Sequence, residues 1–158
     1  MTYSKETGEV SARYRAGGEV TSVRYPSGTH IRFTAPGTVT NGQYGLFEWN
    51  MDGTPGGANP HFHKTFSESF YITEGTVRLF NGEAWIDAVK GDFLYVPPGG
   101  IHAFSNESGA PARMLLLFAP GPPREDYFSE LAAIRSSGRT LTQDEWIALW
   151  ARHDQYPA

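Results

Sequence analysis

Residues 19 to 118 form a series of short apolar and β-branched runs, each ended by a glycine- or proline-containing turn. The 18 glycines and 11 prolines of the chain supply these turns. Asn81-Gly82 separates two such runs and is typical of a tight β-hairpin. We predict a loop over residues 52–60, where glycine and proline are frequent. Many short strands at this spacing favour an all-β sandwich or closed barrel.

The last part of the chain changes to a helical pattern. Apolar residues recur at helical spacing over residues 128–134, and Gly138 follows as a stop. Thr142 and Glu145 form a capping box before a second apolar run, so we predict two short helices between about 123 and 153. The expected organisation is an N-terminal arm at 1–18, a β-barrel at 19–122 and a C-terminal helical appendage at 123–158.

Composition excludes several classes of function. The net charge is -4 and there is no basic run, so neither nucleic acid nor an anionic membrane surface is an expected partner. Cysteine is absent, which rules out disulfides, thiolate metal sites and cysteine nucleophiles. The sequence starts with polar residues and has no long apolar stretch, so we expect a soluble, cytoplasmic protein.

Four potential metal ligands stand out in the sequence: His61, His63, Glu68 and His102. His61 and His63 are two residues apart and can point to the same face of a strand. Glu68 has the wrong parity for the same straight strand, so a bend between them is needed. Imidazole nitrogens with a carboxylate suit Fe, Mn, Ni, Cu or Zn better than Ca or Mg. We predict one divalent transition metal ion.

The residues around these ligands resemble the two motifs of the cupin family. His61-Phe62-His63, followed at the family's spacing by Glu68 and Gly75, resembles the first motif. The second motif is matched at each specified position by Gly91, Pro97, Gly99, His102 and Asn106. One position departs from the pattern, because Pro55 stands where the first motif has a glycine six residues before the first histidine. This difference concerns the loop and leaves the ligand positions matched.

The resemblance implies a double-stranded β-helix, that is, a jelly-roll or cupin barrel, with the metal inside. It also implies that His61, His63, Glu68 and His102 hold that metal. A homodimer is expected, since cupin barrels commonly pair through sheet edges or exchanged arms. The N-terminal segment and the aromatic tail helix are the candidate elements for that pairing.

Side-chain parity suggests residues for the wall of a substrate pocket. Phe70 lies two residues from Glu68, and Phe104 lies two residues from His102, so each should share the inward face of its strand. Phe118, or a neighbour on the last strand, is expected to close the far side. An aromatic wall above a metal favours a flat, apolar substrate. Glu48 could be a buried acid or a solvent-facing residue, and the sequence leaves this open.

Three hypotheses for the function follow. The first is a metal-dependent dioxygenase acting on an aromatic or enolic substrate, similar to the quercetin dioxygenase-like cupins, with Glu68 also serving as a catalytic base. The second is a Lewis-acid enzyme such as a polyketide cyclase or an isomerase. The third is a non-catalytic small-molecule binding or sensor protein. Fold resemblance alone does not choose among them.

Overall fold

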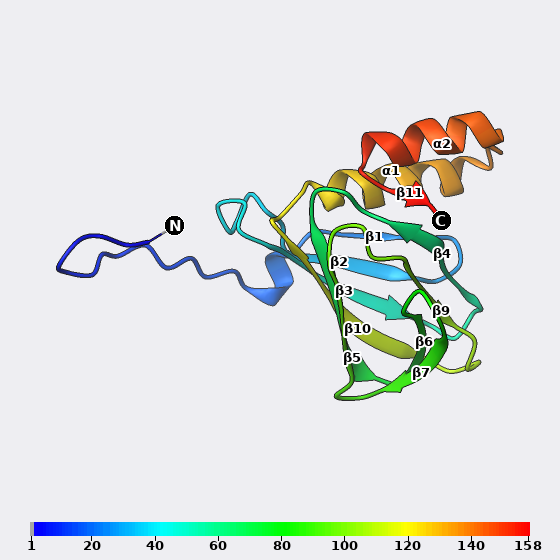
Figure 1. Cartoon of the computed structure of the whole chain (residues 1–158), viewed down its shortest axis with the longest axis horizontal. Helices are drawn as coiled ribbons and strands as arrows, with labels where there is room; N and C mark the ends of the chain where they lie inside the picture. The colour runs from blue at the N-terminus through cyan, green and yellow to red at the C-terminus, as the bar shows by residue number, and fades with distance from the viewer. Residues whose placement is uncertain (1) are drawn as a thin grey trace.

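Two antiparallel β-sheets face each other in the computed structural model, which describes residues 2–158 (Figure 1). The larger sheet has the strand order β1-β2-β3-β10-β5-β8. Its strands are β1 (Ser22–Arg24), β2 (His30–Ala35), β3 (Gly45–Met51), β10 (Ala112–Ala119), β5 (Ser67–Glu74) and β8 (Phe93–Val96).

The smaller sheet has the order β11-β4-β9-β6-β7. Consecutive strands often lie in opposite sheets: β4 leads into β5 of the larger sheet, and β8 leads into β9 of the smaller one. This alternation is the jelly-roll arrangement of a double-stranded β-helix, so the predicted fold class is confirmed. The strands of the smaller sheet are β11 (Tyr156–Pro157), β4 (Gly56–Phe62), β9 (His102–Asn106), β6 (Thr76–Phe80) and β7 (Trp85–Val89).

The hydrophobic core lies between the two sheets. Along β3, Phe47, Trp49 and Met51 are buried, while the residues between them are half-exposed. This alternation is expected for a strand with one face on the core. Glu48 lies on the outer face, where its Oε1 accepts a hydrogen bond of 3.0 Å from Asn50. The question that the sequence left open is therefore answered, since Glu48 points away from the interior.

The predicted loop over residues 52–60 is wrong in its second half, because β4 already begins at Gly56. Gly57 pairs with Ser105 of β9, and there the two backbones approach closely. A Cβ atom on Gly57 would overlap the carbonyl oxygen of Phe104 and lie 2.7 Å from its carbon. The glycines and prolines that suggested a loop thus permit close strand pairing.

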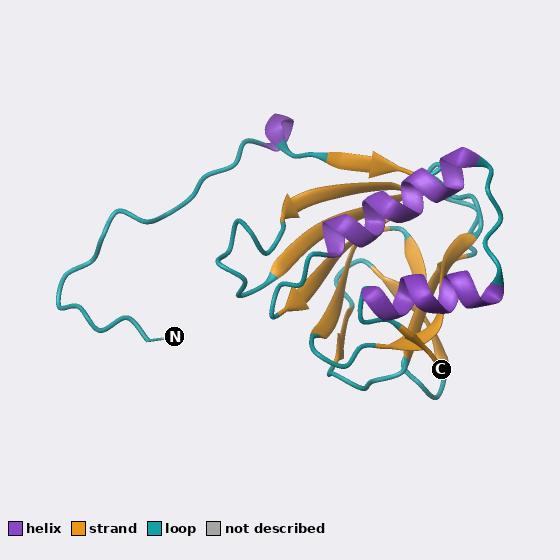
Figure 2. Ribbon diagram, turned by 90° about the horizontal axis from the view of Figure 1, so that it is seen from above, coloured by secondary structure: helices purple, strands orange, loops and turns teal. Residues whose placement is uncertain are grey.

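Two helices follow the last long strand, as predicted: α1 (Arg124–Ser137) and α2 (Gln143–Arg152). Thr142 and Glu145 form the expected capping box at the start of α2. The helices lie together over one side of the sandwich, near β1, β4 and β11 (Figures 1 and 2). Phe128 of α1 contacts the ring of Trp49 edge-on at 5.2 Å between centroids, so the helix contributes to the core.

The N-terminal segment extends away from the sandwich up to a 3-10 turn, η1 (Gly17–Glu19) (Figures 1 and 2). Arg13 and Arg15 connect its end to the domain by hydrogen bonds to backbone carbonyls of residues 33–39. The proposed role of this arm in a homodimer stays a prediction. Among residues 2–158, no helix has both the length and the apolar character needed to cross a bilayer.

The close contact between β4 and β9 predicts that alanine substitution affects stability differently at two neighbouring glycines. Gly57→Ala should lower the free energy of unfolding by about 1–3 kcal/mol, because its methyl group must push β4 away from β9. Gly56→Ala is the matched control, since a Cβ there meets nothing within 4 Å. Chemical denaturation would measure both. Equal stability of the two variants would contradict the close contact.

Candidate metal centre

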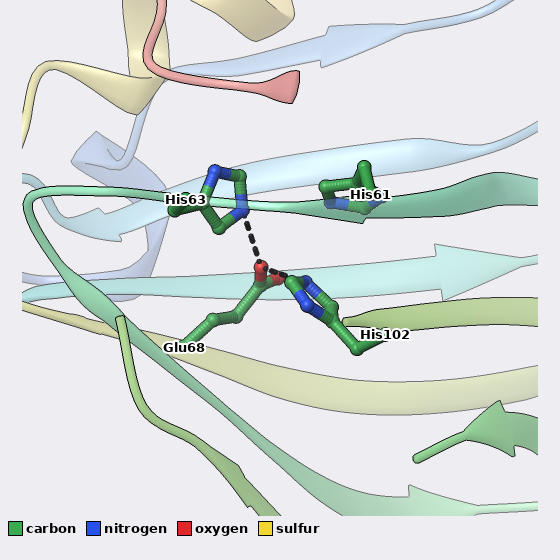
Figure 3. Close-up of side chains that lie close together, drawn as sticks. All are labelled: His61, His63, Glu68 and His102. Atoms are coloured by element: carbon green, nitrogen blue, oxygen red, sulfur yellow. Dashed lines mark hydrogen bonds and ion pairs between the residues drawn. The ribbon is translucent and has the colours of Figure 1, made fainter. Parts of the chain in front are cut away.

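The four candidate ligands come from three strands and the turn that follows one of them. His61 lies in β4 and pairs across the ladder with His102, the first residue of β9. His63 directly follows β4, and Glu68 lies near the start of β5 in the facing sheet. The bend that the sequence requires between His63 and Glu68 is the crossing from one sheet to the other. Figure 3 shows the carboxylate of Glu68 facing His61 and His63 from the opposite side, with His102 beside it.

The four side chains converge inside the sandwich. Their ligand atoms all lie within 4.8 Å of one another, and all four residues are buried. Oε2 of Glu68 lies 3.0 Å from Nε2 of His63 and 2.9 Å from Nε2 of His102 (Figure 3). The sequence-predicted ligands are thus brought together at one point, and together they could hold a metal ion.

Each of the three imidazoles has a backbone carbonyl behind it. Nδ1 lies 2.7 Å from the Asn59 carbonyl in His61, 2.6 Å from the Asp154 carbonyl in His63 and 3.0 Å from the Gly100 carbonyl in His102. A carbonyl can only accept, so each Nδ1 carries the proton and donates. In a neutral ring, Nε2 is then an acceptor directed at the cluster.

This arrangement fits a cation. Two imidazole acceptors face a carboxylate oxygen, which is also an acceptor, and only a shared cation or added protons make such contacts favourable. The donor set of imidazole nitrogens and a carboxylate matches a first-row transition metal. The chain's own residues therefore meet the requirements of the metal implied by the sequence.

The pKa values follow from burial and from the mutual contacts. Burial, together with the charge of His102, lowers the pKa of His61 to about 4, so this imidazole is neutral at pH 7. Burial alone would lower the pKa of His102, but the hydrogen bond and charge of Glu68 outweigh it and raise that pKa. Burial would raise the pKa of Glu68, yet its contacts with His102 and His63, which favour the carboxylate when protons or a cation are shared there, hold that pKa well below its usual value. Glu68 is therefore ionised and suited to a cation.

The segment after α2 completes the surroundings of His63. Besides offering its carbonyl to His63, Asp154 accepts hydrogen bonds at its carboxylate from the backbone N–H groups of Lys64 and Thr65, at 3.1 and 2.8 Å. Asp154 has a φ of 51°, in the left-handed region that Asp tolerates better than most residues. β11 then pairs with β4, opposite His61 and Phe62. The sequence interpretation missed this contribution, because β11 is too short to be recognised as a strand.

A cavity of about 730 Å³ reaches the centre, and His61 and Glu68 are among its lining residues. Its other lining residues come from the turn between β1 and β2, from β3, β4, β9, β10 and β11, and from both helices. The wall is rich in aromatic side chains. They are Tyr25, Trp49, Phe104, Tyr127, Phe128, Trp146 and Trp150.

The three predicted pocket residues have different positions. Phe104 lines the cavity, with its ring 5.4 Å from that of Trp49. Phe70 is fully buried beside His102, at 5.8 Å between centroids, and Phe118 is fully buried beside Phe47. Neither of these two lines the cavity.

Sequence reasoning also missed Arg124, which is 4% exposed and lines the cavity. One signal could have revealed it. An arginine at the first position of a helix, next to Glu125 and Asp126, adds positive charge where the helix dipole favours negative charge. Residues that break a local rule of this kind are often functional.

The family described as "Cupin domain" matches residues 49–118, which include all four candidate ligands. The jelly-roll topology is also that of solved cupin structures. Residues 49–118 of this chain therefore form a cupin domain. Among curated protein sequences, none matches it significantly.

Three solved structures resemble this cupin in fold. KdgF from Halomonas sp. is 14% identical, with a TM-score of 0.63 over 73% of this chain and 99% of its own. The polyketide cyclase RemF from Streptomyces resistomycificus is 22% identical, with a TM-score of 0.58 over 72% and 82%. Streptomyces Pac13, a nucleoside dehydratase, in complex with uridine is 17% identical, with a TM-score of 0.55 over 74% and 88%. At these identities the likeness concerns the fold.

The ligand assignment predicts that His61→Ala removes most of the bound metal, because three donors hold a metal far less tightly than four. His30→Ala is the control, since His30 lies in β2 outside the cluster. Elemental analysis of the purified variants measures metal content, and circular dichroism verifies that both are folded. Parent-like metal content in His61→Ala would refute the assignment.

The contact behind His63 predicts a separate effect on affinity. Asp154→Gly removes the carboxylate that holds this turn but avoids backbone strain at the positive φ. Metal affinity should fall about tenfold, because the backbone carbonyl that accepts from Nδ1 of His63 is then no longer held in place by the carboxylate. Asp92→Gly is the control, because its carboxylate accepts, within residues 2–158, only from Val89 at the distant β7–β8 turn. Competition with a chromophoric chelator measures both, and an unchanged affinity in Asp154→Gly would contradict this role.

Proposed function

We propose that this cupin is a metal-dependent enzyme that oxygenates a small aromatic or enolic compound. One observation supports this most strongly: three histidines and Glu68 converge beside a cavity whose wall is rich in aromatic side chains. A flat, apolar substrate can pack against such a wall. The cavity volume of about 730 Å³ falls in the range typical of small-molecule sites.

His61, His63, Glu68 and His102 would hold the metal. A redox-active metal in this position would supply a Lewis acid for an enol or phenol oxygen and a route for electrons to O₂. The protein provides a fixed donor set, since each imidazole is oriented by a backbone carbonyl. The aromatic wall keeps water away from the reacting end of the substrate.

Glu68 is proposed as the base. Both imidazole contacts involve its Oε2, so Oε1 is the oxygen left to accept a proton from a substrate hydroxyl. The proton moves from the enol or phenol O–H to Oε1, and the substrate oxygen keeps the electron pair as an enolate or phenolate. A base within hydrogen-bond reach contributes roughly 10²–10⁴-fold to a rate.

Cyclisation is the second candidate. It is favoured by the fold likeness to the polyketide cyclase RemF and by the same aromatic cavity. In that case Glu68 would again remove a proton from an enolisable carbon or hydroxyl, and no oxygen would be consumed. The two candidates differ in their need for O₂ and for a redox-active metal.

The test is oxygen uptake by protein loaded separately with Fe, Mn, Ni, Cu or Zn, with a flavonol and a 1,3-diketone as substrates. We expect uptake with at least one redox-active metal and none with Zn. Glu68→Gln should lower the rate about 100-fold or more, because the amide cannot accept the proton. The metal content should fall by a smaller factor than the rate.

Different outcomes would point elsewhere. Turnover that is equally fast with Zn, without oxygen consumption, would replace oxygenation by the Lewis-acid reaction. Binding of the compounds with no turnover under any metal would favour a sensor. Equal loss of metal and activity in Glu68→Gln would leave Glu68 as a ligand only.

A further inference from the structure

Arg124 is a buried cation in the wall of the cavity. Its side chain comes from the first residue of α1 and is 4% exposed. Its guanidinium carbon lies 4.4 Å from the centre of the Tyr127 ring and 5.3 Å from the rings of Phe118 and Phe128. Aromatic faces stabilise a cation, but they do not neutralise its charge.

Among residues 2–158, no carboxylate forms an ion pair with Arg124. Its Nη1 donates to the His153 carbonyl and its Nη2 to the Gln155 side-chain oxygen, both at 3.0 Å. Its Nε has no partner. Burial lowers the pKa of Arg124 and outweighs the charges of Glu68 and Asp154, which favour its ionised form. Burying a charge without a direct ion pair is costly, so such a residue calls for an explanation.

The hydroxyl of Tyr25 is the second unpaired buried donor in the residues that line this cavity. Burial raises the pKa of Tyr25, so the hydroxyl keeps its proton and remains a donor. Arg135 adds another cation on the same side, with its guanidinium carbon 4.4 Å from the centre of the Tyr25 ring. This end of the cavity therefore offers positive charge and donors without matching acceptors.

Acidic side chains are nearly absent from the cavity. Among its lining residues, Glu68 is the only acidic side chain, and it faces the histidines. A divalent ion at the histidine cluster would add further positive charge. A neutral ligand would leave this charge unmatched, whereas an anion would offset it.

We propose that the cavity binds an acidic aromatic or enolic compound, with an ionised oxygen of the ligand beside Arg124 and Tyr25. This inference rests on the proposed function and narrows its substrate class to anions such as aryl carboxylates. The aromatic wall packs against the ring system, while Arg124 provides the counter-charge. Charge-assisted hydrogen bonds are roughly twice as strong as neutral ones, so the subsite selects for the ionised form.

A purely structural role for Arg124 makes a different prediction. Its bonds to residues 153 and 155 connect α1 to the segment before β11. If that were its whole role, Arg124→Met would lower stability and weaken every ligand alike. The charge of the ligand separates the two roles.

The experiment uses a matched pair of probes, naphthalene-2-carboxylate and naphthalene-2-carboxamide, titrated calorimetrically into zinc-loaded protein. The parent should bind the carboxylate about tenfold more tightly than the amide. Arg124→Met should reduce this ratio to about one while amide binding stays within about threefold of the parent. Arg124→Lys should keep part of the preference, because it keeps the charge.

Arg113→Met is the control, because Arg113 is exposed, pairs with Glu74 and does not line the cavity, so its loss should leave the ratio unchanged. Thermal unfolding of each variant reports on folding separately. A parent that does not distinguish the two probes, or binds neither, overturns the proposal. An undiminished preference for the carboxylate in Arg124→Met also overturns it, because the carboxylate would then bind the metal. An equal loss of affinity for both probes in this variant overturns it as well.

The result is independent of catalysis. Failure to observe any metal-dependent turnover would count against the proposed function, yet it would leave the charge preference measurable. Conversely, equal binding of both probes would remove the anion subsite without affecting metal-dependent oxygenation.

Discussion

Backbone carbonyls orient all three imidazoles of the metal centre, and the chemistry of the site depends on this constraint. With each Nδ1 donating outward, Nε2 is the nitrogen left to bind a metal, and in His63 and His102 it lies within 3.0 Å of the Glu68 carboxylate. A freely rotating imidazole would have to lose rotamer freedom on binding, which weakens affinity. The carbonyls come from three separate places in the chain, at Asn59, Gly100 and Asp154, so the centre is formed only when the tertiary structure is complete.

The jelly-roll connection explains why a carboxylate joins three histidines. β4 and β5 are consecutive but belong to opposite sheets, so His63 and Glu68 approach the same point from opposite sides. The ladder between β4 and β9 places His61 beside His102. Close pairing at Gly57 holds these two strands together a short distance from the ligands. Rigid strands thus fix the donors more tightly than loops would.

The strand-and-turn pattern predicted an all-β sandwich or barrel, and the resemblance to the two cupin motifs implied the jelly-roll form and the four residues that converge on the centre. Local pattern could not reveal Asp154 or Arg124, since both act through contacts with residues distant in the sequence. Gly57 was wrongly predicted to lie in a loop, because glycine is typical both of loops and of strands whose backbones approach closely. The alternation of side chains along a strand predicted Phe104 in the cavity wall. It could not show that Phe128 of α1 packs against Phe118, which does not line the cavity.

The candidate ligands and much of the cavity wall come from different segments of the chain. The candidate metal ligands all lie within residues 61–102, whereas much of the aromatic wall, with Arg124 and Arg135, comes from α1 and α2. Related sequences could therefore diverge in the compounds they accept by changing the helices, while the metal chemistry persists. Asp154 limits that freedom, because it follows α2 and holds the imidazole of His63. A helical segment acquired from elsewhere would need to restore this one carbonyl before a new specificity could be used.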